Sequence, residues 1–345
     1  MSHTYPWSIH TIEDAMQKKV RQRFLGLSQG LVEVKGPGYI APIQYANFAH
    51  NYYNFRFFPD DVVIMSHPKC GTTWMQEIIW TMRNNVDVHK AKTTPMKFRA
   101  PFLDMDFLKP AHLDYDSELL SQFTARHPDL DPMKEGIYID HLVNTPRPRT
   151  MNTHLTFDLL NPDLINTAKI VYVSRNPRDA CVSYFHHQRL IRVSEFIGDF
   201  EEFVEYWCQD LIGQGPFWAH VEQAWSKKDH PNVLFIFYED LKEDILTQLQ
   251  RLNAFLETNL TEDQLLKVAQ HTTFESMKNS STINNTAGAV SAGFFKANEG
   301  DFVRKGITGD WQNYFTPEIE KNIEAWMKKW NPISKQVPFK YILND

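Results

Sequence analysis

The sequence predicts an α/β fold: a single domain with a central parallel sheet flanked by helices. Three apolar runs rich in β-branched and aromatic residues, at 61–66, 169–174 and 232–238, have the length of buried strands. A helical pattern follows each of them, and no Gly/Ser/Pro-rich linker divides the 345 residues. Strands that are apolar throughout and alternate with helices are typical of parallel sheets covered on both faces.

The other elements are predicted around these strands in chain order. Residues 11–27 have the spacing of an amphipathic helix, and residues 32–43, punctuated by Gly-Pro-Gly, predict a short hairpin. Helices are predicted over 72–83, 176–190, 241–256, 261–270 and 317–329. Residues 84–150 are rich in Pro, Asp, His and aromatic residues with little periodicity, which predicts loops and short helices. We therefore expect one domain over residues 1–345, with 84–150 inserted as a lid or substrate loop.

Composition argues against several classes of function. The chain is 42% hydrophobic and 23% charged, which is ordinary for a soluble globular protein. Its formal net charge of −6 predicts no general affinity for nucleic acid, and no run approaches the ~20 apolar residues of a membrane span. Its three cysteines fit no disulfide framework and its 14 histidines fit no zinc-ligand spacing. We therefore expect a cytoplasmic protein without a metal centre.

The segment between the first strand and its helix has the composition of a phosphate site. Residues 67–74 are His-Pro-Lys-Cys-Gly-Thr-Thr-Trp, a compact glycine-containing loop that opens a helix. Backbone N–H groups at such a helix start point at an anion, and Lys69 adds a full positive charge. The lysine precedes Gly71, so the Gly-x4-Gly-Lys-Ser/Thr signature of ATP- and GTP-binding P-loops is not matched. The loop therefore predicts a P-loop-like site for a different nucleotide phosphate, and a P-loop kinase is disfavoured.

This loop resembles the sulfate-donor loop of cytosolic sulfotransferases, which usually reads Tyr-Pro-Lys-Ser-Gly-Thr-Thr-Trp. Two further segments resemble the family's cofactor motifs in the same order: residues 175–179 (Arg-Asn-Pro-Arg-Asp) with Ser183, and residues 304–311 (Arg-Lys-Gly-Ile-Thr-Gly-Asp-Trp). Together the three motifs extend from residue 67 to 311 and leave little of the chain outside the resemblance. The resemblance implies sulfuryl transfer, with 3′-phosphoadenosine 5′-phosphosulfate (PAPS) as cofactor and 3′-phosphoadenosine 5′-phosphate (PAP) as its product.

The resemblance also implies which residues hold the cofactor. Lys69 and the loop after it would bind the 5′-phosphate, Arg175 and Ser183 would bind the 3′-phosphate, and aromatic side chains would contact adenine. Arginine can bind a phosphate through two parallel N–H groups, and glycine lets a backbone approach closely. The implied cofactor-binding residues are Lys69, Cys70, Gly71, Thr72, Thr73, Trp74, Arg175, Ser183, Tyr238, Thr272, Phe274, Met277, Phe302, Arg304, Lys305 and Gly306.

Three residues are implied in catalysis: His154, Lys69 and Asn152. His154 lies in a Thr-His-Leu segment that matches the family's general base, and an imidazole with a pKa of ~6.5 is mostly neutral and basic at pH 7. Lys69 would stabilise the leaving phosphate. Asn152 stands where the family has a lysine, and losing such a charge can cost ~10²-fold in rate. Arg147 and Arg149 are neighbouring cations that could compensate.

Other positions also depart from the family pattern. His67 and Cys70 replace the usual Tyr and Ser. A thiol at a helix N-terminus beside Lys69 is expected to have a lowered pKa, with a simple packing role as the alternative. The family's dimerisation element reads Lys…Thr-Val…Glu, and its charge pattern is broken here, so the sequence leaves the oligomeric state open. The corresponding residues are Gln312, Thr316, Pro317 and Lys321.

The acceptor is predicted to be small and lipophilic. The 85 residues from Lys69 to His154 exceed what compact mammalian members lead us to expect, and resemble the insect branch of the family, which includes retinol dehydratase. An aromatic-rich lid suits an apolar pocket. The apolar side chains of this predicted lid include Phe98, Phe102, Met105, Phe107 and Leu108.

We therefore predict an enzyme, a sulfotransferase that transfers the sulfuryl group of PAPS to the hydroxyl of a small lipophilic alcohol or phenol, as in xenobiotic or hormone metabolism. Two alternatives remain open. One is a retinol-dehydratase-like enzyme, in which sulfonation activates an allylic alcohol that then eliminates. The other is a catalytically weak PAP-binding protein, which is motivated by Asn152.

Overall fold

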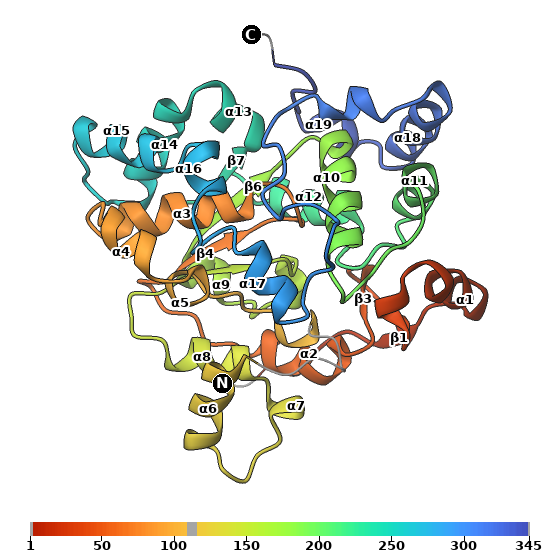
Figure 1. Ribbon diagram of the computed structural model, residues 1–345, viewed down its shortest axis with the longest axis horizontal. Coiled ribbons are helices and arrows are strands. Elements are labelled where there is room, and N and C mark those ends of the chain that lie inside the picture. Colours follow the sequence, from red (N-terminus) through yellow and green to blue (C-terminus); the bar gives the residue numbers. More distant parts are fainter. Residues whose placement is uncertain (1–2, 109–115, 344–345) are drawn as a thin grey trace.

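A four-stranded parallel sheet lies at the centre of the protein. The computed structural model describes residues 3–108 and 116–343, and within these ranges the sheet has the strand order β5-β4-β6-β7 (Figure 1). Its strands are β4 (Val62–Met65), β5 (Thr150–Thr153), β6 (Lys169–Ser174) and β7 (Val233–Phe237), all parallel to their neighbours. The three predicted strands are confirmed. The edge strand β5 was not predicted, because its Thr-Met-Asn-Thr sequence carries one apolar residue only.

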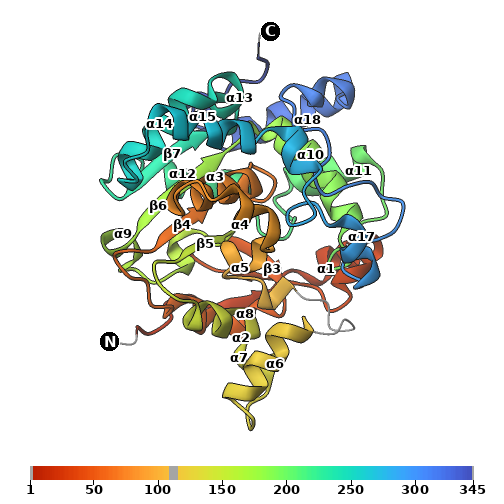
Figure 2. The same ribbon diagram turned by 60° about the vertical axis from the view of Figure 1, so that its left-hand side comes forward.

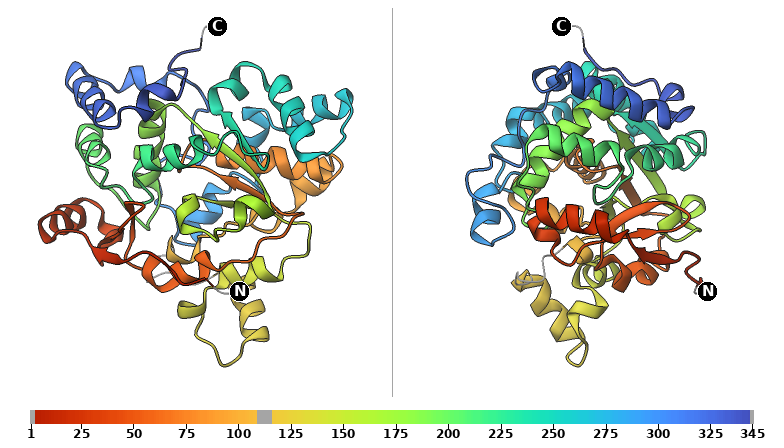
Figure 3. Two further views of the ribbon diagram at one scale, coloured as in Figure 1. Left: turned by 180° about the vertical axis from the view of Figure 1, so that it is seen from behind. Right: turned by 90° about the vertical axis from the view of Figure 1, so that its right-hand side faces the viewer.

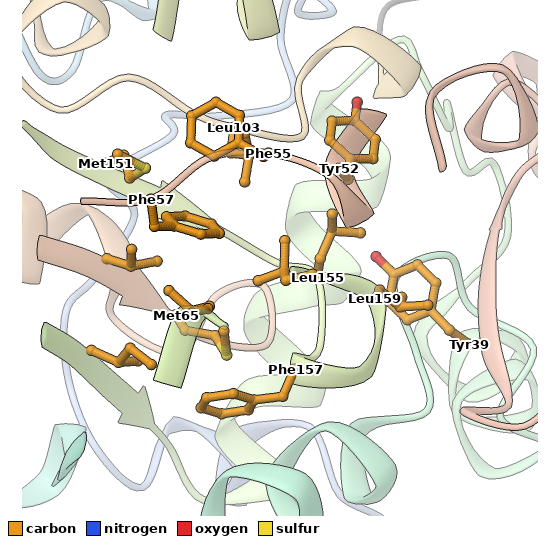
Figure 4. Close-up of a cluster of buried hydrophobic side chains, with 14 of the residues drawn as sticks. Tyr39, Tyr52, Phe55, Phe57, Met65, Leu103, Met151, Leu155, Phe157 and Leu159 are labelled. Carbon is orange, nitrogen blue, oxygen red and sulfur yellow. The ribbon is translucent and has the colours of Figure 1, made fainter. Parts of the chain in front are cut away.

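Alternate side chains of the strands enter different cores. Val62 and Ile64 of β4 pack on one face of the sheet against α3 (Thr72–Arg83), α14 (Ile245–Leu256) and α15 (Glu262–His271), which lie together in Figure 2. Val63 and Met65 enter the opposite core, part of which is drawn in Figure 4. That core also takes side chains from α2 (Tyr45–Tyr53) and α12 (Phe217–Trp225). Both faces of the sheet are therefore covered, as the apolar strands predict.

A third core surrounds the helix that follows β6. This helix, α10 (Pro177–Leu190), packs with α11 (Phe200–Cys208) and α18 (Pro317–Lys329) through an aromatic cluster that includes Phe203, Trp207 and Trp326. Residues 241–256, predicted as one helix, are split at Asp244 into α13 (Tyr238–Glu243) and α14, because Asp244 caps α14 with its side chain. The predicted helices over 72–83, 176–190, 261–270 and 317–329 are confirmed.

The amino-terminal region forms a small sheet of its own. Strands β1 (Ile9–Thr11), β2 (Leu31–Val34) and β3 (Tyr39–Pro42) pair antiparallel, which confirms the predicted hairpin. The predicted helix over 11–27 is shorter, as α1 (Asp14–Arg23) followed by the 3-10 turn η1 (Leu25–Leu27). Gly36 turns the hairpin with φ of 104°, and a side chain there would meet the Trp7 ring.

The predicted insertion contains short helices, several of which project from one end of the molecule (Figure 3). Leu119, Phe123 and Ile137 form a small core among them. The elements are α4 (Val88–Thr93), α5 (Met96–Arg99), η2 (Asp106–Leu108), α6 (Ser117–Arg126), α7 (Pro132–Glu135) and α8 (Ile137–Asn144). Residues 109–115 of the predicted lid lie outside the described residues.

Short elements complete the chain. Among the described residues, no helix combines the length and apolar character needed to cross a membrane. The remaining elements are η3 (Phe157–Leu159), α9 (Leu164–Thr167), α16 (Phe274–Lys278), α17 (Thr286–Ser291), η4 (Asp310–Asn313) and α19 (Ile333–Gln336).

Candidate active site

A cavity of about 590 Å³ opens where the parallel strands end. Every residue predicted for the site lines it except Cys70. One part, which we call the cofactor end, is lined by residues 69, 71–74, 175, 183, 238, 272, 274, 277 and 302–306. The other part, the acceptor end, is lined by residues 96, 97, 100–102, 105, 108, 138, 191, 193, 194, 289, 294 and 295. His154 and Asn152 also line this cavity.

The loop between β4 and α3 is held in the tight turn that the sequence predicts. Gly71 precedes α3 with φ of 107°, and a Cβ at this position would lie 2.9 Å from the Tyr238 ring. Lys69 also has a left-handed backbone, with φ of 66°. Residues other than glycine rarely adopt such angles, and where they do the strain is often functional. The turn places the lysine and the start of α3 at one wall of the cavity.

Three cations, Lys69, Arg175 and Arg304, converge at the cofactor end, and among the described residues only Arg304 has a carboxylate within 3 Å, that of Asp310 at 2.7 Å. Lys69 Nζ lies 4.1 Å from the centroid of the Phe302 ring, and no ion pair joins it to a carboxylate in the described part of the chain. Burial, followed by the charges of Arg175 and Arg304, lowers the pKa of Lys69 to about 7. A buried lysine beside two arginines is unfavourable unless an anion joins them, so this end is suited to a phosphate.

Unused hydrogen-bond donors support the same conclusion. Arg175 Nε and Arg304 Nη1 are buried without a partner, and so is the hydroxyl of Thr308. Buried donors are nearly always satisfied in proteins, and each exception needs an explanation. Phosphate oxygens would supply acceptors for the two guanidinium groups. The residues present therefore fit a nucleotide phosphate.

Two distant motifs are joined at this end by Asp179. Its carboxylate accepts the backbone N–H groups of Gly309 at 2.8 Å and Trp311 at 3.1 Å, which ties α10 to the carboxy-terminal motif. It also lies 3.7 Å from Arg175, whose Nη2 donates to the carbonyl of Ile307 at 2.6 Å. Asp179 thus fixes the carboxy-terminal motif against α10. Arg175 Nε has no partner in the described part of the protein and can donate a hydrogen bond to a ligand.

Aromatic side chains build the wall expected for adenine. The Trp74 and Tyr238 rings meet edge to face with centroids 5.5 Å apart. Phe274 packs so closely on Gly306 that a Cβ there would come within 2.2 Å of its ring, which explains why glycine is needed at φ of 64°. Thr272 is fully buried and its hydroxyl donates to the carbonyl of Val268 at 2.9 Å.

His154 directly follows β5, and its ring is held in one tautomer. Nδ1 lies 2.7 Å from the carbonyl oxygen of Ser66, which can only accept, so we assign the proton to Nδ1 and a free lone pair to Nε2. Phe102 contacts the ring edge to face, with centroids 4.9 Å apart. Burial lowers the pKa of His154 to about 3, so the imidazole is neutral at pH 7. Such a ring can accept a proton through Nε2.

The comparison with known proteins decides the family. The family model of the sulfotransferase domain matches residues 59–335 of this chain. The chain belongs to the sulfotransferase family. Sulfotransferase 1B1 of Canis lupus familiaris is 33% identical over 292 residues, which cover 84% of this chain and 90% of that protein. Luciferin sulfotransferase of Photinus pyralis is 31% identical over 292 residues, covering 83% of this chain and 76% of that protein.

Solved structures of a sulfotransferase-fold enzyme align over almost the whole chain. Retinol dehydratase in a complex with retinol and PAP has a TM-score of 0.84 at 29% identity, and the alignment covers 99% of this chain and 100% of that chain. Retinol dehydratase in complex with androsterone and inactive cofactor PAP has a TM-score of 0.83 at 30% identity, covering 96% and 97%. The predicted family and fold are therefore confirmed.

The departure of this sulfotransferase at Asn152 is not compensated by the nearby arginines. Asn152 is 1% exposed, and its side-chain amide lies 2.7 Å from that of Gln76 on α3. Arg149 is paired with Asp61 and Arg147 with Asp60, and neither arginine lines the cavity. They flank the amino ends of the strands, opposite to the site. The hypothesis that they replace the family lysine is therefore wrong.

The departures at residues 67 and 70 are packing substitutions. Burial raises the pKa of the Cys70 thiol to about 12, so the expectation of a lowered pKa is wrong. Its side chain belongs to a buried apolar cluster and does not line the cavity, so a cofactor contact by Cys70 would be made through its backbone and stays a prediction. His67 is 2% exposed and packs edge to face on Tyr184 and Phe217. Both side chains fill space behind the loop.

The acceptor end of the cavity is apolar and only partly predicted. Phe102, Met105 and Leu108 line it as expected, whereas Phe107 is buried in the core and Phe98 packs on the small cluster between α6 and α8. Sequence reasoning missed the facing wall, since these residues belong to no recognisable motif. This wall includes Ile191, Val193, Phe294 and Phe295.

Proposed function

We propose that this sulfotransferase transfers the sulfuryl group of PAPS to the hydroxyl of a small lipophilic alcohol or phenol. The observation that carries the proposal is a single cavity that holds Lys69, unpaired within the described residues, beside Arg175 and Arg304, a neutral imidazole and an apolar wall. PAPS supplies an activated sulfuryl group on its 5′-phosphate, and sulfotransferases use it as their donor. The apolar acceptor end supports a lipophilic acceptor.

The proposed roles follow from charge and tautomer. His154 takes the hydroxyl proton of the acceptor on Nε2, while Nδ1–H stays bonded to Ser66, so the ring does not need to turn. Lys69 and the N–H groups of residues 71–73 neutralise the charge that develops on the leaving phosphate. Arg175, Ser183 and the turn at residues 304–306 hold the 3′-phosphate. The remaining roles are adenine contacts by Trp74, Tyr238, Thr272, Phe274 and Met277, with Phe302 packing on Lys69.

We further propose that residues 84–150 act as a lid on the acceptor end, within a single domain. Phe102, Met105, Leu108 and Tyr138 of this segment already line one of its walls. The proposal of a cytoplasmic enzyme is supported by three free cysteines, two of which are buried.

A second candidate function is retinol-dehydratase-like elimination after sulfonation. It is favoured by alignment of this chain with retinol dehydratase over 99% of its length, insertion included. A weak PAP-binding protein is the third candidate, because Asn152 leaves this position without a cation.

One experiment separates the three. The purified enzyme is incubated with sulfur-35-labelled PAPS and a panel of phenols, sterols and allylic alcohols, and the products are identified by mass spectrometry. A labelled sulfate ester supports the favoured function, and a dehydrated polyene with free labelled sulfate supports elimination. Tight PAP binding without turnover on any acceptor would overturn both in favour of the binding protein.

A further inference from the structure

A buried carboxylate outside the predicted site holds the backbone of His154. Asp104 is fully buried, and its two oxygens accept the backbone N–H of His154 at 3.2 and 3.3 Å. The hydroxyl of Thr153 bonds to the same carboxylate. Because β5 ends at Thr153, no other acceptor for the His154 N–H is found among the described residues. Removing Asp104 would leave this part-buried N–H without a protein partner, which is unfavourable.

The segment that carries Asp104 runs along the end of β5. Asn152 N–H donates to the carbonyl of Pro101 at 3.0 Å, and Leu103 N–H donates to the carbonyl of Asn152 at 2.9 Å. The ring of Phe102, between them, packs on His154. The next residues along this segment, Met105 and Leu108, line the acceptor end. The segment that lines the acceptor end therefore also packs on the His154 ring and hydrogen-bonds to its backbone.

We propose that Asp104 is a positioning residue that fixes the backbone of His154, so that Nε2 stays directed at the acceptor hydroxyl. The proposal rests on the role of His154 as general base given above. The imidazole is held through two anchors: Nδ1–H on Ser66 and the backbone N–H on Asp104. Losing one anchor lets the end of β5 move, and a displacement of about 1 Å at a reacting group can cost about 10²-fold in rate.

A matched control lies two residues along the chain. Asp106 is also buried, and burial raises the pKa of both carboxyls to about 7. Asp106 accepts the backbone N–H groups of Tyr138 at 3.1 Å and Ile139 at 3.0 Å, so it anchors α8 rather than His154. Both residues are buried aspartates whose carboxylates accept backbone N–H groups. Asp104 accepts from His154, whereas Asp106 accepts from α8.

The test compares Asp104→Ala, Asp104→Asn and Asp106→Ala in the full chain. The ring of His154 is followed by NMR with carbon-13-labelled histidine, assigned through the signal that is lost in His154→Gln. In the wild type, burial keeps this ring neutral and its signal constant down to about pH 5. In Asp104→Ala the loosened ring becomes solvated and titrates between about pH 5 and 7. Asp106→Ala leaves the His154 signal constant.

Turnover and PAP affinity complete the test. Asp104→Ala lowers kcat by about 10- to 100-fold with an unchanged Kd for PAP. Asp104→Asn, which keeps an acceptor oxygen in place, stays within about threefold of the wild type. A wild-type rate and a constant signal in Asp104→Ala would overturn the proposal, and so would the same titration in Asp106→Ala.

A further variant and the NMR measurement cover two possible failures, misfolding of Asp104→Ala and the lack of a competent acceptor. If Asp104→Ala does not fold, Asp104→Glu keeps an acceptor but moves it by one methylene, so a lowered kcat is again expected and a wild-type kcat overturns the proposal. The NMR measurement needs no acceptor. If the wild type turns over no acceptor, the proposed function fails, whereas the placement of His154 by Asp104 is still tested by its titration.

Discussion

The two ends of the cavity are built in different ways. The cofactor end is assembled where strands β4, β6 and β7 pass into loops and helices, and its motifs are tied together by buried groups such as Asp179. Most of the lining of the acceptor end comes from outside the parallel strands, from the insertion and from residues 191, 193, 194, 289, 294 and 295. One end uses fixed charge and the other uses apolar surface.

The difference shows how one fold can keep the same sulfuryl donor while the acceptor substrate changes. Ion pairs and backbone hydrogen bonds require particular residue types at particular places, so the cofactor end tolerates little change. Apolar walls require only volume and hydrophobicity, which many residues supply. His154 stands at the boundary, with one anchor on the loop after β4 and one on the insertion. Substitutions should therefore separate into those that alter PAP affinity and those that alter turnover alone.

The largest effect is expected at the boundary itself. His154→Ala removes the proposed base and should lower the single-turnover rate by about 10²–10⁴-fold, because proton removal from the acceptor then depends on water. The Kd for PAP should stay nearly unchanged, since the ring faces the acceptor. Rates are measured with labelled PAPS and a competent acceptor, and His10→Ala, an exposed histidine outside the cavity, is the control. A His154→Ala enzyme with the wild-type rate would remove the mechanism.

Charge removal at the cofactor end should act on binding. Lys69→Ala and Arg304→Ala each remove a charge-assisted phosphate contact of about 1.5–3 kcal/mol, which corresponds to roughly 10- to 150-fold in the Kd for PAP. Lys97→Ala is the matched control, because Lys97 lines the other part of the cavity and pairs with Asp116. Calorimetric titration with PAP measures all three. Equal affinities in all three variants would contradict the division of the cavity.

The sequence allowed one end to be predicted far better than the other, for a physical reason. Phosphate binding needs Lys69, Gly71 and Arg175 next to strand ends, and that combination is visible in a linear sequence. Ile191 and Phe294 are ordinary apolar residues, whose meeting depends on tertiary packing alone. The same limit explains why Phe107 was assigned to the pocket although it lies in the core.

Strand β5 shows a second limit of the sequence. Its side chains are all buried, yet three of its four residues are polar, so hydrophobic pattern could not reveal it. His154 was placed in the site through resemblance rather than through any strand prediction. Asp104, which lies 50 residues earlier in the chain, carried no signal at all, because an isolated aspartate in a loop is usually a solvated charge.

A smaller effect is expected from restoring the family lysine. Asn152→Lys should raise the single-turnover rate by up to about tenfold with little change in the Kd for PAP, because a cation there would stabilise charge that grows during transfer. Asn152→Gln, which adds length without charge, is the control. A slower Asn152→Lys enzyme would show that the amide pair with Gln76 is needed to hold the end of β5.

The smallest effect concerns the proton carried by Lys69. Burial, with Arg175 and Arg304, lowers its pKa to about 7, so the free enzyme loses this charge as the pH rises above 7. A bound phosphate favours the ammonium and raises the pKa again, so PAP binding at pH 8 should take up more than half a proton. Affinity should consequently weaken by about fivefold from pH 7 to pH 8, where the phosphates of PAP are already ionised.

Calorimetry in two buffers of different ionisation enthalpy measures this uptake, and Lys69→Arg is its control. Arginine keeps the charge at every pH used, so the variant should bind PAP without taking up a proton and without the loss of affinity at pH 8. Equal proton uptake in the wild type and in Lys69→Arg would assign the proton to another group. In that case Lys69 would not be neutral in the free enzyme at pH 8, and all three cations of the cofactor end would be charged before the nucleotide binds.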